Sequence, residues 1–273
     1  MAIKKTKKTN NSQFDDIQAK IVPVGERPFY LAALFYGRSG TGKTALASSF
    51  PKPMLLLDVR EKGTDTIAKV PNIDVIPIDE WDEIEKTYWY LASGTKYKTV
   101  VIDQISQMQD LAMTQVLSEK GKSPGDLLHK NDWGSISGKM KTWLFHYRDL
   151  IDKDMHVVFN AHDRTSTNDD NVEDQLDPSV GARLMPSLAS AVNGAVSVIG
   201  NTFIREDYVG KEKERQVKYC LRIGPHAYYV TKTRHPIDFD APEYIVDPTF
   251  EKITRVIRGE NAPIRKLNQK VRR

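Results

Sequence analysis

The sequence predicts an α/β fold, in which a mostly parallel sheet has helices on both faces and an antiparallel C-terminal extension. Short apolar runs alternate with longer amphipathic stretches between residues 29 and 192, which is typical of parallel strands joined by crossover helices. From residue 195 onward, apolar runs of strand length follow one another without helical stretches between them. We expect these later strands to join the same sheet in antiparallel fashion.

The individual elements follow from the spacing of apolar residues. Runs of about four to eight apolar residues predict strands, and apolar residues at every third or fourth position predict helices. Pro51 and Pro53 end the first helix, because proline cannot continue the helical hydrogen-bond ladder. The predicted strands are 29–36, 53–59, 73–78, 99–105, 156–161, 195–204, 218–223 and 228–233. The predicted helices are 43–50, 81–92, 106–119, 136–152 and 183–192, and a polar stretch rich in carboxylates spans 163–180.

Length and composition indicate one large globular domain. The chain has 273 residues, of which 40% are hydrophobic and 28% charged. No apolar run approaches the roughly 20 residues that span a bilayer, and the basic N-terminus lacks the apolar segment of a secretory signal. The single cysteine, Cys220, excludes an internal disulfide. We therefore expect a cytoplasmic protein that does not bind membranes.

Positive charge is concentrated at the two ends of the chain. The first eight residues contain four lysines, and seven basic residues against one acidic residue follow from Arg255 onward. Because the whole chain carries a net charge of only +4, the part between these ends is acidic. We expect a disordered basic tail over residues 1–15, one domain over 16–257 and a basic C-terminal tail over 258–273. Such tails either contact polyanions or simply increase solubility.

The segment Gly37–Thr44 has the sequence GRSGTGKT and fits the nucleotide-binding pattern G-x-x-x-x-G-K-[ST]. Its glycines let the backbone approach phosphates closely and adopt positive φ. In this pattern Lys43 reaches the β and γ phosphates, and the Thr44 hydroxyl ligates Mg²⁺. The predicted strand before the loop and helix after it favour this interpretation over a flexible glycine turn. We predict a site for ATP and Mg²⁺ formed by Gly37, Arg38, Ser39, Gly40, Thr41, Gly42, Lys43 and Thr44.

A single carboxylate, Asp103, follows four residues of a predicted buried strand, Thr99–Ile102. At the end of such a strand it can hold the water shell of Mg²⁺ beside Thr44, or alternatively cap the following helix. Many proteins with this loop place a glutamate directly after the aspartate, but this chain has Gln104. The group that orients the attacking water must then come from another strand. The candidates are Glu61, which we favour, and Asp58, unless both are ordinary solvated loop charges.

The phosphate loop, the acidic loop after the second strand and Asp103 on the fourth strand together resemble the RecA-like ATPase core. The similarity is greatest to phage-encoded nucleotide-binding proteins that keep only this core and are regarded as single-strand-annealing recombinases. It covers roughly residues 29 to 257. The resemblance implies that His162 senses the γ-phosphate and that Lys232 and Arg234 reach the nucleotide of a neighbouring subunit. Alternatively, Lys232 and Arg234 only form surface salt bridges.

The resemblance also implies function and assembly. It implies ATP hydrolysis and action on single-stranded DNA in phage recombination or replication, in the host cytoplasm, by a homo-oligomeric ring or filament. The loop after His162 contacts DNA in RecA proteins, but here it is acidic and would repel phosphates. A second loop that could contact DNA combines positive charge with a surface on which bases can stack. Alternatively, this loop is only solvated and its tryptophan packs in the core. Its candidate residues are Lys120, Lys122, His129, Lys130 and Trp133.

Two other functions remain open at this stage. One is a small-molecule P-loop kinase, which would need an arginine-rich lid over its acceptor. The segments that could form a lid, 119–135 and 163–180, contain a single arginine, Arg164, which argues against a kinase. The other is a DNA-binding scaffold that uses nucleotide as a switch without catalysis, and Gln104 is compatible with it.

Overall fold

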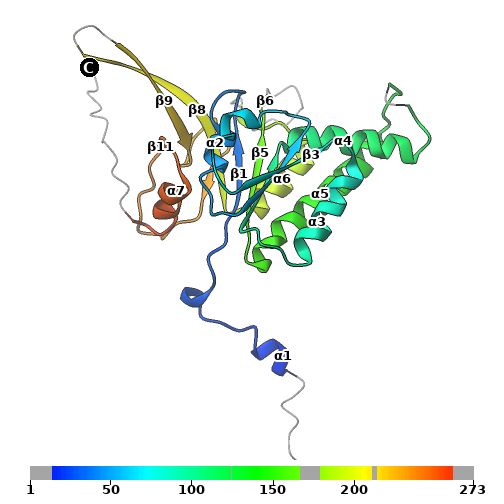
Figure 1. Ribbon diagram of the computed structural model, residues 1–273, viewed down its shortest axis with the longest axis horizontal. Coiled ribbons are helices and arrows are strands. Elements are labelled where there is room, and N and C mark those ends of the chain that lie inside the picture. Colours follow the sequence, from blue (N-terminus) through cyan, green and yellow to red (C-terminus); the bar gives the residue numbers. More distant parts are fainter. Residues whose placement is uncertain (1–13, 124, 167–178, 211–213, 261–273) are drawn as a thin grey trace, which may run out of the picture.

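Figure 1 presents the protein as a computed structural model. The structure describes residues 14–123, 125–166, 179–210 and 214–260. Most of the two predicted basic tails and most of the predicted acidic stretch 163–180 lie outside these described residues. Within the described ranges, no helix is both long enough and apolar enough to cross a membrane.

Nine strands of the described chain form one sheet in the order β11-β9-β8-β1-β5-β4-β2-β3, with β10 paired to β8. The strands from β3 to β8 in this order are parallel, whereas β9, β10 and β11 are antiparallel to their partners. This arrangement confirms the predicted parallel sheet with an antiparallel extension. The strands are β1 Ala32–Tyr36, β2 Met54–Val59, β3 Ile73–Ile78, β4 Thr99–Asp103, β5 His156–Ala161, β8 Val198–Val209, β9 Glu214–Arg222, β10 Lys232–Thr233 and β11 Tyr244–Val246.

Helices pack on both faces of the sheet, as predicted (Figure 1). Alternate residues of β1 point to opposite faces, so Leu34 and Tyr36 join one apolar core while Ala33 and Phe35 join the other. The first core is covered by α3 Trp81–Ala92, α4 Ile105–Glu119, α5 Lys130–Arg148 and α6 Pro186–Ala195. The second is covered by α2 Lys43–Ala47 and α7 Phe250–Ile257.

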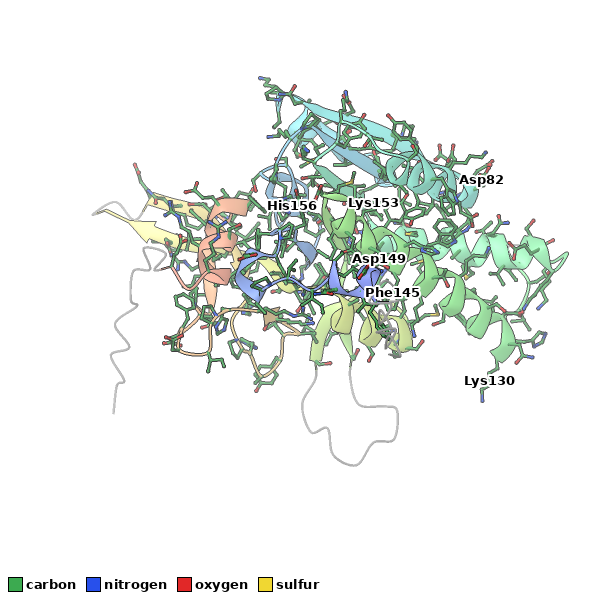
Figure 2. All side chains as sticks on the ribbon, turned by 90° about the horizontal axis from the view of Figure 1, so that it is seen from below. Asp82, Lys130, Phe145, Asp149, Lys153 and His156 are labelled. Atoms are coloured by element: carbon green, nitrogen blue, oxygen red, sulfur yellow. The ribbon has the colours of Figure 1, made fainter. Side chains whose placement is uncertain are left out.

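Figure 2 shows α5 running from Lys130 at the periphery to Phe145, with Asp149 beyond it, near the middle of the view. The remaining described elements are short. They are α1 Asp15–Gln18, the two-stranded sheet β6 Asp163–Ser166 and β7 Ser179–Ala182, and the 3₁₀ helices η2 Val24–Glu26, η3 Thr64–Ile67 and η4 Asp149–Lys153.

The carboxyl ends of the central strands carry a row of polar side chains. In the parallel register, Asp58 of β2 pairs with Asp103 of β4, and Asp103 pairs with Asn160 of β5. The same level of the sheet is reached on β1 by Phe35, two residues before Gly37. The sheet therefore brings the phosphate loop and these three side chains to one edge.

Strands β8 and β9 form a hairpin that projects from the body at this same edge (Figure 1). β8 pairs with β1 only from Val198 to Asn201, and Asn201 is opposite Tyr36, the last residue of β1. Beyond Asn201, β8 continues to Val209 and pairs only with β9. The hairpin thus extends the sheet past the phosphate loop, along one side of it.

Several predicted boundaries differ from those observed; the strand predicted over 195–204, for example, is β8 Val198–Val209. Three other differences have a clear local cause. Helix α2 ends at Ala47 rather than residue 50, because the chain closes into tight turns in which the Ser49 and Phe50 N–H groups donate to Leu46 and Ala47. Helix α5 begins at Lys130 rather than at residue 136, because His129 and Asp132 form a reciprocal cap at its observed start. The predicted strand 228–233 is reduced to Lys232–Thr233, because the N–H groups of Tyr228 and Tyr229 turn back to His226 Nδ1.

Candidate functional site

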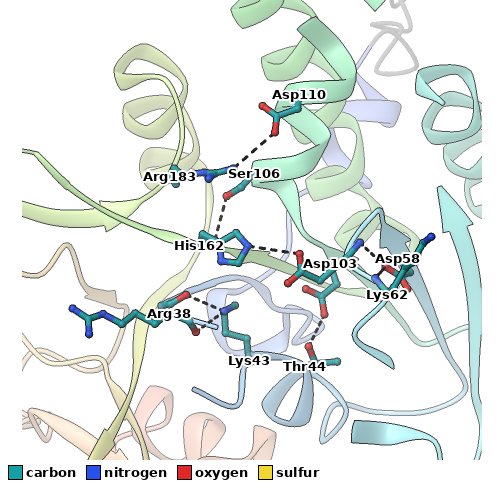
Figure 3. Close-up of polar contacts among 12 residues, drawn as sticks. Arg38, Lys43, Thr44, Asp58, Lys62, Asp103, Ser106, Asp110, His162 and Arg183 are labelled. Carbon is teal, nitrogen blue, oxygen red and sulfur yellow. Dashed lines mark hydrogen bonds and ion pairs between the residues drawn. The ribbon is translucent and has the colours of Figure 1, made fainter. Parts of the chain in front are cut away.

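The phosphate loop connects β1 to α2, and two of its glycines have left-handed backbone conformations. φ is +78° at Gly40 and +88° at Gly42, where other residues would be strained. The Lys43 ammonium is buried and donates to the carbonyls of Gly37 and Arg38, both at 2.9 Å (Figure 3). Burial lowers the pKa of Lys43, and this is opposed chiefly by the nearby Asp103 carboxylate. The loop therefore encloses a positive charge that phosphate oxygens can take over from the two carbonyls.

Asp103 and Thr44 meet directly beside this lysine. The Thr44 hydroxyl donates to Asp103 Oδ2 at 2.7 Å (Figure 3), while Oδ1 is buried without a hydrogen-bond partner in the described structure. Burial raises the pKa of Asp103, and the hydrogen bond from Thr44, the nearby Asn160 amide and the charge of Lys43 act in the opposite direction. An unpaired carboxylate oxygen beside a hydroxyl fits the outer shell of Mg²⁺, which retains several waters in protein sites.

Within the described ranges, no group of three or more histidine, cysteine, aspartate or glutamate side chains is arranged to hold a metal ion. The Thr44 hydroxyl and the Asp103 carboxylate fit a magnesium ion held mainly by phosphates and water. A metal site formed entirely by protein side chains would require a different arrangement.

The two carboxylates after β2 have different environments. Asp58 is buried, and its Oδ1 accepts hydrogen bonds from the backbone N–H groups of Glu61 (3.0 Å) and Lys62 (2.9 Å). These bonds hold a tight loop in which Arg60 and Lys62 both have positive φ. Glu61 instead lies with Oε2 3.6 Å from His162 Nε2, and its charge acts on both Lys43 and Asp103. Asp58 therefore shapes the loop, and Glu61 is the carboxylate directed toward the phosphate site.

His162 follows β5 and lies between this loop and α4. Its backbone N–H donates to Ser106 Oγ at 3.2 Å, and its imidazole faces Glu61 (Figure 3). The structure therefore brings together the phosphate loop, Asp103, Glu61 and His162, which come from four separate segments of the sequence.

Asn160 is a site residue that our sequence analysis did not identify. It is fully buried opposite Asp103, and neither amide atom has a hydrogen-bond partner within the described chain. Buried amides are normally satisfied, so an unpaired one at a nucleotide site has capacity for a ligand or water. The available signal was a polar residue near the end of the otherwise apolar strand HVVFNA.

Lys232 and Arg234 do not join the site of their own chain. Lys232 pairs with Ile199 near the start of β8, and its ammonium donates to the carbonyls of Asn193 and Gly194 at the end of α6. Arg234 lies just outside β10. Since Val198, the neighbour of Ile199, is level with Ala33 near the start of β1, this pair lies toward the sheet edge opposite the phosphate loop. Its predicted role at a neighbouring subunit stays a prediction.

The hairpin contacts the phosphate loop closely. Thr202 of β8 shares a hydrogen bond of 2.7 Å with the Thr41 hydroxyl and also donates to the Tyr36 carbonyl at 3.3 Å. A Cβ atom on Gly37 would lie 2.4 Å from the Thr202 carbonyl oxygen. The loop therefore has a glycine at Gly37 because β8 occupies the adjacent space.

The expected DNA-binding loop has less free positive charge than its sequence indicated. The ammonium groups of Lys120 and Lys122 bind the two carboxylate oxygens of the buried Asp132, at 2.6 and 2.8 Å. These contacts lower the pKa of Asp132 well below its usual range. Trp133 is 43% exposed, so it is not a core residue and keeps a surface for stacking. The role of this loop in DNA binding stays a prediction.

Comparisons with known proteins gave one family match and a similar solved structure. Among solved structures, the flagellar accessory protein FlaH from Methanocaldococcus jannaschii is similar, with a TM-score of 0.41 and 11% identity over 86% of this chain and 91% of that chain. None of the curated proteins matches the sequence. A family model described as an AAA domain matches residues 30–235, which contain the phosphate loop, Asp103 and His162. The chain therefore belongs to the AAA domain family and contains the domain of a P-loop ATPase.

Proposed function

We propose that this protein binds ATP with Mg²⁺ and hydrolyses it. The observation that carries the proposal is the convergence of Lys43, the Thr44–Asp103 pair and the Glu61–His162 pair at one edge of the sheet. A phosphate-binding loop alone would explain Lys43 and Thr44. It would not require a second carboxylate, Glu61, directed at the same place.

Each side chain has a distinct task in the proposed hydrolysis. Lys43 neutralises phosphate oxygens, and bound Mg²⁺ adds further positive charge there. Glu61 orients a water molecule and accepts its proton as the water oxygen attacks the γ-phosphorus and the bond to the bridging oxygen breaks. His162 lies next to Glu61 and donates a hydrogen bond to the phosphate that is released. Asp103 and Asn160 hold the water and metal shell beside Thr44.

We further propose that the protein acts on single-stranded DNA as a homo-oligomer in phage recombination or replication. The resemblance to RecA-like annealing proteins and the basic ends of the sequence support DNA binding. Assembly is supported by an apolar segment at the start of the described chain. Its side chains Phe14, Ile17, Ile21 and Val24 are 53–88% exposed, which is costly unless another surface covers them.

The test measures ATP hydrolysis and the mass of the protein assembly in solution, with and without single-stranded DNA. We expect turnover that requires Mg²⁺, rises with DNA and is absent in Lys43→Ala. DNA binding should weaken steeply with salt, because it depends on phosphate neutralisation, and removal of residues 259–273 should weaken it further. Tight ATP binding without turnover would refute catalysis and favour a nucleotide-switched scaffold. Turnover only with a small acceptor would indicate a kinase.

A further inference from the structure

We propose that one face of the β8–β9 hairpin, centred on Tyr219, is the platform on which the base of the bound nucleotide stacks. This inference rests on the proposed nucleotide binding and adds the part of the site that the phosphate loop does not explain. This hairpin face is lined by Ile204, Tyr208, Val217 and Tyr219 and by the Glu206–Arg215 ion pair, all on the same side of the ribbon as Leu221.

The direction of the nucleotide follows from the groups around the loop. Asp103 and Glu61 come from β4 and from the end of β2, which lie on one side of β1. The γ-phosphate belongs near these groups, so the α-phosphate, ribose and base extend to the other side of the loop. The strand on that other side is β8, whose hairpin projects past the loop (Figure 1).

Tyr219 lies at the junction between the loop and the hairpin face. A Cβ on Gly42 would lie 3.1 Å from Cδ1 of Tyr219, so the ring packs against the N-cap residue immediately before α2. Leu221, on the same face, joins the apolar core beneath α2. Tyr219 as a residue is nevertheless 45% exposed, and Ala45 of the adjacent helix is an exposed residue with a small side chain. A partly exposed tyrosine thus borders the phosphate loop.

Beyond Tyr219 the hairpin face combines exposed apolar side chains with the Glu206–Arg215 ion pair. Ile204 is directly opposite Tyr219 on β8 and is 42% exposed, as is Val217, and Tyr208 is 63% exposed. Solvent-exposed aromatic and aliphatic side chains grouped on a two-stranded ribbon gain stability when covered. A planar base stacked on Tyr219 covers the part of the face nearest the loop, and stacking on an aromatic ring is tolerant of base identity because every base has a π-surface.

The hairpin also limits how the base can be recognised. The backbone groups of β8 and β9 bond to each other along the ladder, and the Tyr219 carbonyl accepts the N–H of Asp247. The strand at Tyr219 therefore has little backbone capacity to bind the edge of a base. Recognition through stacking alone predicts similar affinity for ATP and GTP and weaker affinity for UTP, whose single ring offers less stacking area.

The test compares a nucleotide with a ligand that lacks the base. Titration calorimetry with Mg²⁺ measures the affinity of a non-hydrolysable ATP analogue and of inorganic tripolyphosphate for the full-length protein. We expect Tyr219→Ala to weaken binding of the analogue about tenfold and to leave tripolyphosphate affinity unchanged. Tyr219→Phe should preserve both affinities, and Tyr208→Ala, farther along the same face, should change neither.

Three outcomes would overturn the inference. If Tyr219→Ala weakens tripolyphosphate as much as the analogue, the ring supports the loop rather than the base. If Tyr219→Ala changes neither affinity, the base lies elsewhere. A smaller oligomer mass in Tyr219→Ala than in the wild type at the same protein concentration would then assign the hairpin face to contact with a second copy. If the unmodified protein binds neither ligand, the proposed nucleotide binding itself fails, which separates that failure from failure of the stacking platform.

Discussion

Replacement of Asp103 by asparagine should stabilise the ligand-free protein while impairing its function. Asp103 is 4% exposed, and its Oδ1 has no hydrogen-bond partner in the described structure. A buried acceptor left unsatisfied costs about 1–3 kcal/mol, and more when it is charged. The Asp103→Asn side chain can still accept the hydrogen bond from Thr44 without carrying a buried charge. We expect a gain of about 1–2 kcal/mol in the free energy of unfolding, or about 2–8 °C in Tm for a domain of this size.

The pH dependence of this gain tests its electrostatic origin. Because the pKa of Asp103 is raised in the folded protein, the native state binds the proton more tightly than the unfolded chain does. Wild-type stability therefore falls as pH rises from about 3.9, the usual pKa of an aspartate, through the higher native pKa. The Asp103→Asn variant lacks this pH-dependent contribution to stability, because asparagine does not titrate. The difference in stability between the two proteins should be small near pH 4 and largest at neutral pH.

Thermal melts should be recorded at several pH values, with and without Mg²⁺ and a non-hydrolysable ATP analogue. If Asp103 contributes tenfold to affinity for the metal–nucleotide complex, ligand at 100 times the wild-type Kd should stabilise the variant by about 1.3 kcal/mol less than the wild type. The ligand would thus remove most of the variant's advantage. Asp58→Asn is the matched control, because Asp58 accepts two backbone N–H bonds and its neutralisation should destabilise the protein by about 1 kcal/mol. A ligand-free Asp103→Asn variant less stable than wild type at neutral pH would refute the reasoning.

Three further predictions concern the water-activating residue, the loop and assembly. Glu61→Gln should bind ATP normally but hydrolyse it at least about 100-fold more slowly. If Glu61→Gln turns over normally and Asp58→Asn does not, Asp58 is the residue that activates water. Gly37→Ala should lower the free energy of unfolding in urea by about 1–3 kcal/mol, because its Cβ would collide with the Thr202 carbonyl. Gly138→Ala in α5, where the space is open, should raise it. Equal effects of the two substitutions would contradict the Gly37–Thr202 contact. Arg234→Ala should bind ATP without hydrolysing it, turnover per wild-type subunit should rise with protein concentration, and mixing Arg234→Ala with Lys43→Ala should restore part of the activity. Concentration-independent turnover by a monomer would exclude a residue supplied by a neighbouring subunit.

Much of the fold was predictable because its signals are local. A run of apolar residues predicts a strand wherever it occurs, and Gly37–Thr44 carries its own phosphate-binding geometry in eight consecutive residues. Asp103 was predictable for a similar reason, since a single carboxylate at the end of an apolar run has few structural explanations. Each of these inferences needs only neighbouring residues.

The remaining features depend on contacts between distant segments. Asp58 and Glu61 are equivalent in the sequence, and only the backbone N–H groups bound by Asp58 separate their roles. Lys120 and Lys122 look like free charges until α5 brings Asp132 between them. Asn160 is recognisable only once β5 is known to lie between the strand of the phosphate loop and the strand of Asp103. For Asn160, the order of the strands rather than their existence was the missing information.

The contact between Gly37 and Thr202 has a consequence for protein engineering. A phosphate-binding motif is usually transplanted as a contiguous cassette, on the assumption that its glycines serve the ligand. Here the first glycine is also required by a carbonyl 165 positions later in the chain, at 2.4 Å from where a Cβ would lie. A chimera that combines this loop with a foreign β8 would lose the Thr41–Thr202 hydrogen bond, so the two segments should be exchanged as a pair. Shortening of the hairpin should begin only beyond the Ile204–Tyr219 pair, because Tyr219 also packs against Gly42 of the loop.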